Sequence, residues 1–479
     1  MSPEGKNGRV RPVEQSAPRL AIGERSPMKP LRTVTESTAA GKALRDKIAR
    51  EELAHWKADK RRPDPIKLLR SSDDGRLREL VPIRYGRMLQ SPFAFYRGSA
   101  GIMAADLART PVTGLKVQAC GDCHLANFGG FATPERNILF DINDFDETLP
   151  GPWEWDVKRL AASFVLAARS LGVSDAKGRD AALESARSYR THLREYAEMH
   201  PLEVWYSRID QNDFLERLPK NIQTFVRKRF RKAAKRSGSE MDFPKLTDIA
   251  NGRIRISDSP PLIFHPEAAR GPEFSEILSQ VFLAYRETLS EDHRFLLDQY
   301  QVVDAAIKVV GVGSVGRRCW IALMMSASNH PLFLQFKEAV ASVLEPFAGK
   351  SAHAHHGQRV VIGQRLMQPA SDVFLGWVTA PNGRQFYVRQ LRDAKIKPLI
   401  ETWDAQILTL YATACGWVLA RNHAKTGDQC AISGYLGNSD TFEQAIGDFA
   451  LAYADQAERD HAALKAAARS GKINVYLEG

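Results

Sequence analysis

The chain has 479 residues, of which 44% are hydrophobic and 26% are charged, and its formal net charge is +11. This length suits two or three lobes of about 100–200 residues each, and the composition is that of a globular protein. No run approaches the roughly 20 apolar residues of a membrane span, and the first residues lack the apolar core of a secretory signal. Five cysteines do not suggest a disulfide framework, so we expect a cytoplasmic protein without a membrane partner.

Two segments hold much of the excess positive charge. The start of the chain is basic and rich in Pro, Ser and Gly, and we expect residues 1–40 to form a disordered tail. A second cluster has nine Lys or Arg and no acid between Arg217 and Arg236. This pattern is typical of a solvated helix face. It could also bind nucleic acid, although it lacks the regular aromatic residues of a base-stacking surface.

The hydrophobic periodicity changes twice along the chain. Residues 41–299 have mainly helical spacing, clearest over 175–200 and 274–300, whereas 300–395 contain short β-rich runs separated by glycines and turns. Within that block, 357–368 and 384–393 both continue the strand pattern. Helical spacing returns over 396–479. The predicted fold class is α+β, with a β-rich lobe placed in sequence between the segments of a helical lobe.

Polar side chains gather in two neighbouring stretches, QACGDCHLAN (118–127) and NILFDINDFDE (137–147). Asp122 and Asn127 lie in the first stretch, while Asp141 follows a short apolar strand in the second and Asp144 comes next. Carboxylates and carboxamides at this density suit a hard cation such as Mg²⁺ with a bound phosphate. Phosphoryl transfer needs an Asp near the substrate hydroxyl, with an Asn and an Asp on the metal. Acidic loops are also common turn material, so each residue taken singly has a structural alternative.

The cysteines of CGDC carry less information than the acids around them. A structural zinc site needs four ligands, and Cys120 and Cys123 with His124 offer three at most, without a second CxxC. A thioredoxin-like pair would lie between a strand and a helix of a small βαβ unit, without a charged metal ligand between its cysteines. We therefore expect neither metal binding nor redox chemistry from these two residues.

A G-x-G-x-x-G pattern occurs at Gly311, Gly313 and Gly316, with Ser314 among them. A dinucleotide-binding site would need a helix after the glycines, but residues 317–325 predict a strand. The order strand, glycines, strand is that of the hairpin that covers the nucleotide phosphates in kinases.

Lys337 ends the next apolar strand, PLFLQFKEA (331–339), and could reach those phosphates. Residues 338–346 predict the start of a helix, and Glu338 and Glu345 are candidate salt-bridge partners of the lysine. The alternative is a surface lysine on an edge strand.

Two resemblances follow from these stretches. From about residue 45 to 475 the chain resembles the bacterial "domain of unknown function 2252" family, through CGDCHLANFGGFATPERNILFDINDFDETLPGPWEWDVKRLAASF, VVGVGSVGRRCW, LFLQFKEA and CGWVLARNHAKTGD. The motifs also resemble those of aminoglycoside-phosphotransferase and choline-kinase-like enzymes of the protein-kinase-like superfamily. In those enzymes an H-G-D-x-H-x-x-N loop precedes an acidic segment and a Y-D-L-A helix start.

This second resemblance implies a two-lobed kinase-like fold and a set of residue roles. Asp122 would accept or orient the proton of the attacking hydroxyl, and Asn127 with Asp144 or Asp141 would hold Mg²⁺. Lys337 would bind the phosphates of ATP and the adenine would lie near residues 387–391. Further implied roles are phosphate contacts by the backbone of 311–316 including Ser314, orientation of the lysine by Glu338 or Glu345, and loop stabilisation by His124 and Asp156.

Arg97 is a candidate for binding an anionic substrate or product phosphate, because a guanidinium makes bidentate contacts to oxyanions. Its alternative is a structural salt bridge to Asp106 or to the acidic segment.

The order of the motifs departs from that of the kinases. There the glycines and lysine come first, whereas here they follow Asp122. Residues 416–427, GWVLARNHAKTG, resemble the helix that precedes the catalytic loop in the phosphotransferases. Moving 300–479 ahead of 80–300 restores the kinase order, so we infer a circular permutation, which is tolerated where neighbouring surface sites can be joined.

Three functions are consistent with the sequence. The first is an ATP- and Mg²⁺-dependent phosphotransferase, or a nucleotidyl transferase on the same scaffold, with an unidentified acceptor. The second is a catalytically inactive nucleotide-binding regulatory module. The third is a nucleic-acid-associated protein that uses the 217–236 cluster. The phosphotransferase hypothesis further requires that Lys337 and Asp144 face the same cleft.

Overall fold

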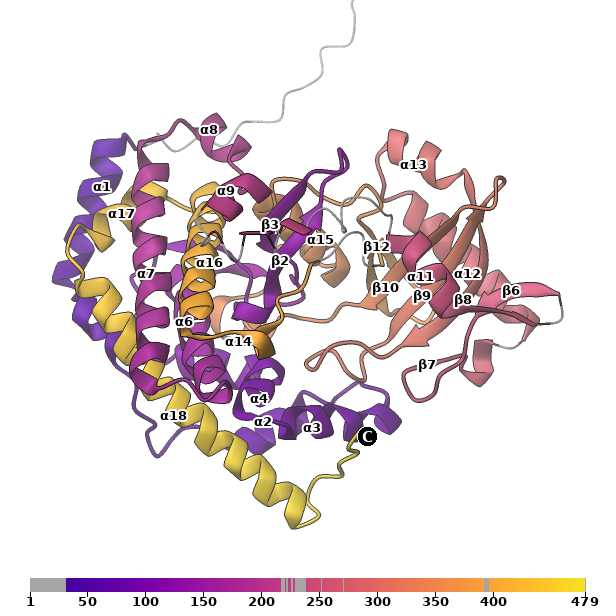
Figure 1. Ribbon diagram of the computed structural model, residues 1–479, viewed down its shortest axis with the longest axis horizontal. Coiled ribbons are helices and arrows are strands. Elements are labelled where there is room, and N and C mark those ends of the chain that lie inside the picture. Colours follow the sequence, from indigo (N-terminus) through magenta and orange to yellow (C-terminus); the bar gives the residue numbers. More distant parts are fainter. Residues whose placement is uncertain are drawn as a thin grey trace, which may run out of the picture.

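The computed structural model describes residues 32–216, 220, 223–224, 227–228, 238–250, 252–269, 271–391 and 396–478. Residues 1–31 of the expected tail and most of the 217–236 cluster lie outside these ranges. The described chain is a mixed α+β structure in which a larger sheet occupies one side and long helices the other (Figure 1).

The larger sheet is antiparallel throughout and lies on the right in Figure 1. Its strands, in spatial order, are β11 (Gly376–Thr379), β12 (Gln385–Gln390), β10 (Pro331–Glu338), β9 (Cys319–Ser326), β8 (Tyr300–Lys308) and β7 (Ile263–Phe264). Strands β8 to β12 thus all fall between residues 300 and 395. Because β10 lies in the middle of the sheet, its second-to-last residue Lys337 is 3% exposed rather than a solvated edge lysine.

Apolar side chains attach helices to this sheet. Phe282 and Tyr285 of α12 (Pro272–Arg286) stack edge-on against Phe336 of β10, with ring centroids 5.1 and 5.7 Å away. Beside them lie α13 (Glu291–Leu297), α11 (Gly238–Leu246) and the hairpin of β5 (Thr247–Ala250) and β6 (Arg253–Ile256).

The segment 357–368 was expected to be a strand and is helical instead. It lies in α15 (His356–Met367), which begins with the Gln358 amide donating to Nδ1 of His355. Its β-branched run suggested a strand, but the buried side chains recur at helical spacing, from Val360 to Gln364 and Met367. The expected helix over 338–346 is also different, because Glu338 still belongs to β10 and only Glu345–Ala348 (α14) is helical.

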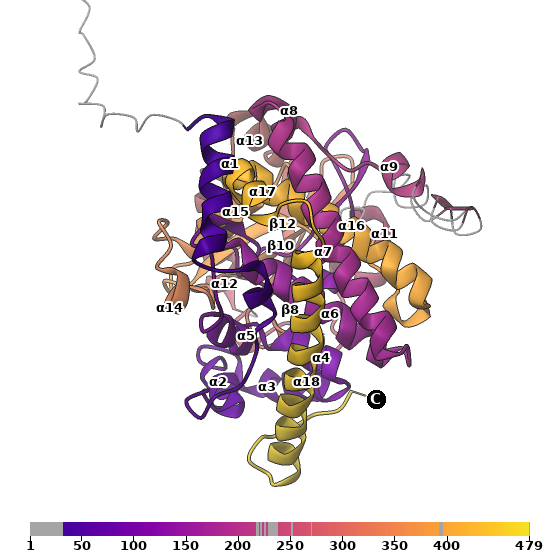
Figure 2. The ribbon, with the colours of Figure 1, turned by 90° about the vertical axis from the view of Figure 1, so that its left-hand side faces the viewer.

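The other side of the molecule is a bundle of long helices from both ends of the chain. The central members are α6 (Trp153–Ser170), α7 (Asp175–Glu198), α16 (Ala405–Thr426) and α18 (Thr441–Arg469); α6 and α7 contact each other, and both contact α16 and α18. Figure 2 views the bundle with α18 in front of α6 and α7. Trp153 is fully buried among Tyr189, Tyr435 and Phe442 and marks the centre of this core.

Shorter helices complete the bundle. These are α17 (Gln429–Leu436), α8 (Pro201–Tyr206), α9 (Gln211–Glu216) and α1 (Val34–Ala43). The expected disordered tail therefore ends before residue 40. Helix α1 forms because Thr33 and Glu36 make a capping box and because Gly41 allows close contact with the backbone of Ala431.

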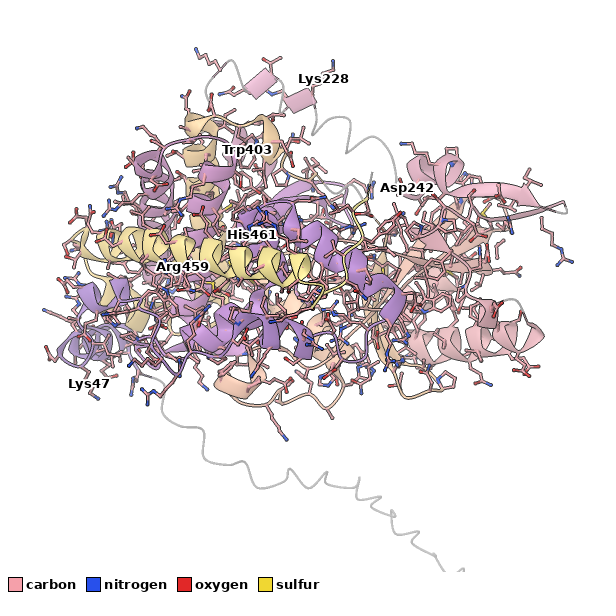
Figure 3. The ribbon with its side chains drawn as sticks, turned by 90° about the horizontal axis from the view of Figure 1, so that it is seen from below. Lys47, Lys228, Asp242, Trp403, Arg459 and His461 are labelled. Carbon is pink, nitrogen blue, oxygen red and sulfur yellow. The ribbon has the colours of Figure 1, made fainter. Side chains whose placement is uncertain are left out.

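Four short helices near the N-terminus lie between the bundle and the sheet. They are α2 (Pro65–Ser71), α3 (Val81–Leu89), α4 (Pro92–Gly98) and α5 (Ala100–Leu107). Figure 3 shows the molecule from below, with α18 and its residue His461 crossing this region; Nε2 of His461 lies 3.2 Å from the Leu89 carbonyl oxygen. No helix in the described ranges is long and apolar enough to cross a membrane.

Candidate active site

Two small hairpins carry the polar motifs at the junction of sheet and bundle. Strand β1 (Lys116–Ala119) pairs with β4 (Leu149–Pro152), and β2 (Phe128–Ala132) pairs with β3 (Ile138–Ile142). The Asp122 loop (residues 120–127) links β1 to β2, and the acidic segment (residues 143–147) links β3 to β4. The Asp122 loop follows β1 and the acidic segment follows β3. The two polar stretches predicted from the sequence therefore lie side by side. The Asn143 amide donates to the Asn127 carbonyl at 2.8 Å.

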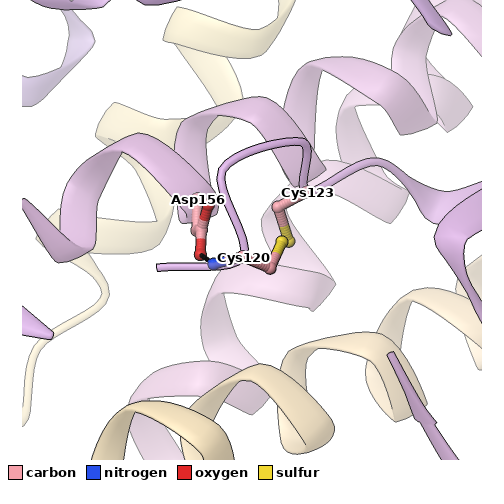
Figure 4. A group of neighbouring side chains, drawn as sticks. All are labelled: Cys120, Cys123 and Asp156. Atoms are coloured by element: carbon pink, nitrogen blue, oxygen red, sulfur yellow. Dashed lines mark hydrogen bonds between the residues drawn. The ribbon is translucent and has the colours of Figure 1, made fainter. Parts of the chain in front are cut away.

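Asp156 of α6 holds the start of the Asp122 loop. Its carboxylate accepts hydrogen bonds from the amides of Cys120 at 2.7 Å and Gly121 at 3.1 Å, the first of which is drawn in Figure 4. Gly121 has a φ of +80°, and an added Cβ would lie 2.3 Å from the Glu147 carbonyl oxygen. The loop therefore depends on a glycine and a buried carboxylate, which agrees with a loop-anchoring role for Asp156.

Cys120, Cys123 and Asp156 lie close enough to suggest a metal site (Figure 4). Burial raises the pKa of Cys120 well above its ordinary value and that of Cys123 to about 11, so both thiols stay protonated at neutral pH. The Asp156 carboxylate is already occupied by the two loop amides. Because thiolates are the zinc-binding form of cysteine, this geometry favours a buried structural turn.

Asp122 lies at the bottom of the site against Arg159 of α6. Nε of Arg159 donates to Oδ1 of Asp122 at 2.8 Å, and Nη2 donates to the same oxygen. Burial nevertheless raises the pKa of Asp122, against the effect of Arg159. The Asn127 side chain donates to the Asp122 carbonyl at 2.9 Å, which fixes the amide in the loop.

His124 lies beside Asp122, with Nε2 3.8 Å from Oδ2. Burial, reinforced by the neighbouring Arg159 and Arg97, lowers its pKa well below the ordinary value, so the imidazole is neutral. Its Nδ1 is buried and has no hydrogen-bond partner among the described residues.

The acidic segment meets the lysine of the sheet. Nζ of Lys337 lies 2.5 Å from Oδ2 of Asp146 and 3.8 Å from Oδ2 of Asp144. Tyr387 of β12 donates to Oδ1 of Asp146 at 2.7 Å. Burial and the neighbouring Asp146 raise the pKa of Asp144. Burial also opposes ionisation of Asp146, but the Lys337 ammonium outweighs it and lowers the pKa of that carboxyl.

Asp141, the alternative metal candidate, points into the helical bundle. Nη2 of Arg421 lies 2.5 Å from its Oδ2, and Asn422 donates to its Oδ1 at 3.0 Å. Both partners are on α16, and Asp141 is 1% exposed. Strand alternation explains the difference from the expectation, since Asp141 lies in β3 and faces α16 whereas Asp144 lies beyond the strand.

The expected glutamate partners of Lys337 need correction. Glu338 is the next residue of β10, and it pairs with Arg384 at 2.6 Å and accepts from the Arg318 amide at 3.0 Å. Glu345 accepts from the Ser342 amide at 3.4 Å. Asp146 occupies the position beside the lysine that we expected a glutamate to fill.

The glycine loop (residues 309–318) joins β8 to β9 and closes over the acidic segment. The Ser314 hydroxyl lies 3.4 Å from Oδ2 of Asp146. Gly316 has a φ of +85°, and its carbonyl accepts from the Leu77 amide at 2.8 Å, which ties the loop to the N-terminal helices. Gly311 and Gly313 line the same cavity as Asp122 and Asn127.

That cavity has a volume of about 230 Å³ and receives residues from three distant parts of the chain. Its lining includes Asp122, His124, Asn127, Asp144, Asp146, Glu147, Arg97, Gly311, Gly313, Ser314 and Glu338. Among the predicted site residues, Asp141, Asp156, Gly316, Lys337 and Glu345 do not line it; Lys337 instead contacts Asp144 and Asp146, which do. Arg97 does not pair with Asp106, whose carboxylate is bound by Arg62 at 2.8 Å.

Sequence reasoning missed three contributors to the site. Asp146 was part of the acidic motif without a role, although an acid two residues after Asp144 was available to face the lysine. Arg159 could have been found, because it lies three residues after Asp156 on one face of a helix. Nothing in the sequence pointed to Tyr387, since its contact with Asp146 depends on how sheet and bundle meet.

A comparison with known protein families identifies the family of this chain. The family model "Uncharacterized protein conserved in bacteria (DUF2252)" matches residues 76–467, and the chain belongs to this family. The matched range contains the Asp122 loop, the acidic segment, the glycine loop and Lys337. No curated protein and no solved structure matches the chain.

Proposed function

We propose that this protein is an ATP- and Mg²⁺-dependent phosphotransferase that acts on an unidentified acceptor. The observation that carries the proposal is the contact of Lys337 with Asp144 and Asp146, two acids that line one cavity together with Asp122, Asn127 and the glycine loop. These are the parts that phosphoryl transfer requires: a phosphate-binding lysine, oxygen ligands for a metal, a loop of backbone amides and an acid beside the acceptor.

The topology of the sheet supports a kinase-like nucleotide lobe. The glycine loop joins the first and second of the consecutive strands β8, β9 and β10, and Lys337 lies on the third. Protein kinases likewise use a glycine-rich loop over the phosphates and a lysine on their third strand. In this chain Asp146, rather than a glutamate of α15, is the acid beside the lysine; α15 has no acidic residue.

Neighbouring chain segments support the inferred circular permutation. Helix α16 ends at Thr426, whose hydroxyl accepts a hydrogen bond from the Gln118 amide of β1 at 3.2 Å. The end of α16 therefore adjoins the strand that leads into the Asp122 loop. A kinase-like order would connect these two elements directly, and permutation is tolerated where ends lie close together.

The donor set fits a divalent cation and a nucleotide phosphate. The pKa of the Asp144 carboxyl is raised by burial and by Asp146, so the negative charge of Asp144 is not fully compensated. Hard oxygen ligands of this kind suit Mg²⁺, and we assign Asn127 Oδ1 and Asp144 to it, with Asp146 adjacent. When bound, the ion would neutralise charge on the phosphates.

The remaining residues would position the reactants. Lys337 would exchange its contact with Asp146 for a phosphate oxygen, and the backbone of 311–316 would cover the phosphates. Asp122 would accept the proton of the acceptor hydroxyl, while Arg159 fixes its orientation. Because transfer depends on positioning and charge stabilisation, loss of Lys337 or Asp144 should lower the rate by orders of magnitude.

A second candidate is a nucleotide-binding regulatory module without catalysis. The observation that favours it is the contact of Arg159 with Asp122, in which two nitrogens donate to one carboxylate oxygen. A carboxylate held in this way is a weaker proton acceptor.

Release of ADP from Mg·ATP by the full chain, with and without pools of small-molecule acceptors, tests the proposal. Wild type should release ADP, whereas Asp122→Asn and Asp144→Asn should not. Mg·ATP binding without ADP release under every condition would favour the regulatory module. Absence of both binding and release would overturn both candidates.

A further inference from the structure

One wall of the cavity carries an excess of positive charge. The arginine cluster (Arg76, Arg84, Arg97 and Arg317) lines this wall, three of its members coming from residues 76–97 and the fourth from the glycine loop. Three of its four members therefore come from outside the segments that carry the kinase-like motifs.

The acids that line the cavity are largely committed to other groups. Asp122 pairs with Arg159, Asp146 with Lys337, and Glu338 with Arg384. Glu147 accepts from the Val343 amide at 2.7 Å. Glu147 and Asp122 are near enough to attract the arginine cluster, but among the described residues its ion pairs are with Asp73, which does not line the cavity.

Within the cluster the arginines bond mainly to neutral carbonyl groups. Arg76 donates to the Ser72 carbonyl at 2.9 Å, and Arg317 donates to the Asp74 carbonyl at 2.9 Å. Arg84 pairs with Asp73 at 2.6 Å. Burial lowers the pKa of Arg76 well below its ordinary value, and the neighbouring Arg84 and Arg317 lower it further.

Arg97 is the member that is ready to receive a ligand. Its Nε is buried without a hydrogen-bond partner among the described residues, and its guanidinium carbon lies 6.0 Å from the centroid of the Phe93 ring. His124, with its own unpartnered Nδ1, lines the same cavity. A buried guanidinium nitrogen without a partner is costly unless a ligand supplies an acceptor oxygen.

We propose that the acceptor carries a phosphate or carboxylate group and that Arg97, with Arg76 and Arg317, binds this group during transfer. The inference rests on the proposed function and names the substrate class of the same site. It separates this protein from phosphotransferases with cationic acceptors, because a cationic acceptor would meet four arginines at this wall. Arg makes bidentate contacts to planar and tetrahedral oxyanions, which suits either anionic group.

Calorimetric titration of the full chain with inorganic phosphate tests the site, alone and with saturating Mg²⁺ and a non-hydrolysable ATP analogue. Wild type should bind phosphate in both conditions, and Arg97→Ala should weaken phosphate binding about tenfold or more. The same variant should change the affinity for the analogue less than about twofold. Arg255→Ala, which removes an exposed arginine of β6 far from the cavity lining, is the charge-matched control and should change neither affinity.

The outcomes distinguish phosphate binding at the acceptor site from phosphate binding at the nucleotide site. They also distinguish the proposed anion site from the proposed phosphotransferase activity. Competition between phosphate and the analogue, with analogue affinity reduced in Arg97→Ala, would assign the arginines to the nucleotide and overturn the inference. Absent phosphate binding by wild type, or binding that Arg97→Ala leaves unchanged, would also overturn it. Arg97-dependent phosphate binding without analogue binding would uphold the anion site and count against the phosphotransferase. Circular dichroism of Arg97→Ala and Arg97→Lys checks that folding is retained, and Arg97→Lys should recover part of the affinity.

Discussion

Lys337 and Asp146 join the two sides of the molecule through a 2.5 Å contact between Nζ and Oδ2. The lysine lies near the end of the central strand β10, while the aspartate follows β3 beside the helical bundle. Oδ2 of Asp144 lies 3.8 Å from the same nitrogen, which meets the requirement that Lys337 and Asp144 lie close together. The ammonium therefore lies within 3.8 Å of both aspartate carboxylates of the acidic segment.

Replacement of Asp144 should remove nucleotide binding without loss of stability, whereas replacement of Asp141 should lower the stability of the fold. Asp144→Asn removes a half-buried carboxylate whose pKa is raised, so without ligand its free energy of unfolding should stay within about 0.5 kcal/mol of wild type or rise above it. It should lose Mg²⁺-dependent nucleotide binding. Asp141→Asn leaves Arg421 buried without its ion partner, so its free energy of unfolding should fall by about 3–5 kcal/mol.

Urea unfolding and nucleotide titration of both variants check this prediction. Asp141→Asn is the matched control, since it removes the same charge from a position close in sequence. If Asp141→Asn abolished metal-dependent binding while remaining folded and Asp144→Asn did not, the assignment of the metal ligand would be reversed.

The anchoring of the Asp122 loop predicts a difference between Asp156 and the cysteines. Asp156→Ala leaves the Cys120 and Gly121 amides unpaired, so we expect a loss of about 1–3 kcal/mol in the free energy of unfolding and weaker nucleotide binding. Cys120→Ala and Cys123→Ala should retain nucleotide binding, and purified wild type should hold no stoichiometric zinc. Metal analysis and thermal unfolding give the readouts; stoichiometric zinc that disappears in Cys123→Ala would contradict this interpretation.

These residues illustrate what the sequence could predict. The Asp122 loop, the acidic segment and the glycine loop were found because their chemistry lies in contiguous letters. The partner of Lys337 was not, because the choice among Glu338, Glu345 and Asp146 depends on which segment the bundle places against β10. Likewise α15 was expected to be a strand, since Val360, Val361 and Ile362 favour strands locally and only packing against β11 and β12 reveals the helical face. Asp141 and Asp144 could not be separated before the end of β3 was known.

Asp122 should make the reaction rate depend on pH in the acidic range. Burial raises the pKa of Asp122 above its ordinary value of 3.8, and the carboxylate form is the proton acceptor. The rate should therefore fall as the pH drops through this raised pKa and should be constant above it. Asp122→Asn should lower the rate by about 10²–10⁴-fold and remove the acid limb of the profile.

A pH–rate profile of ADP release for wild type and Asp122→Asn provides the test. Arg159→Lys supplies a second variant, because a weaker partner should raise the pKa of Asp122 further and shift the acid limb to higher pH. An unchanged acid limb in Asp122→Asn would remove Asp122 from the role of proton acceptor.

The most direct test of the central claim is the stabilisation of the full chain by Mg·ATP. At about 100 times its dissociation constant, Mg·ATP should raise the free energy of unfolding of wild type by about 2.7 kcal/mol. ATP with EDTA in place of Mg²⁺ should give a smaller gain, and Lys337→Ala and Asp144→Ala should give little or none. Stabilisation of wild type that requires Mg²⁺, Lys337 and Asp144 is the predicted result. A wild-type protein that Mg·ATP does not stabilise at any concentration would contradict the account.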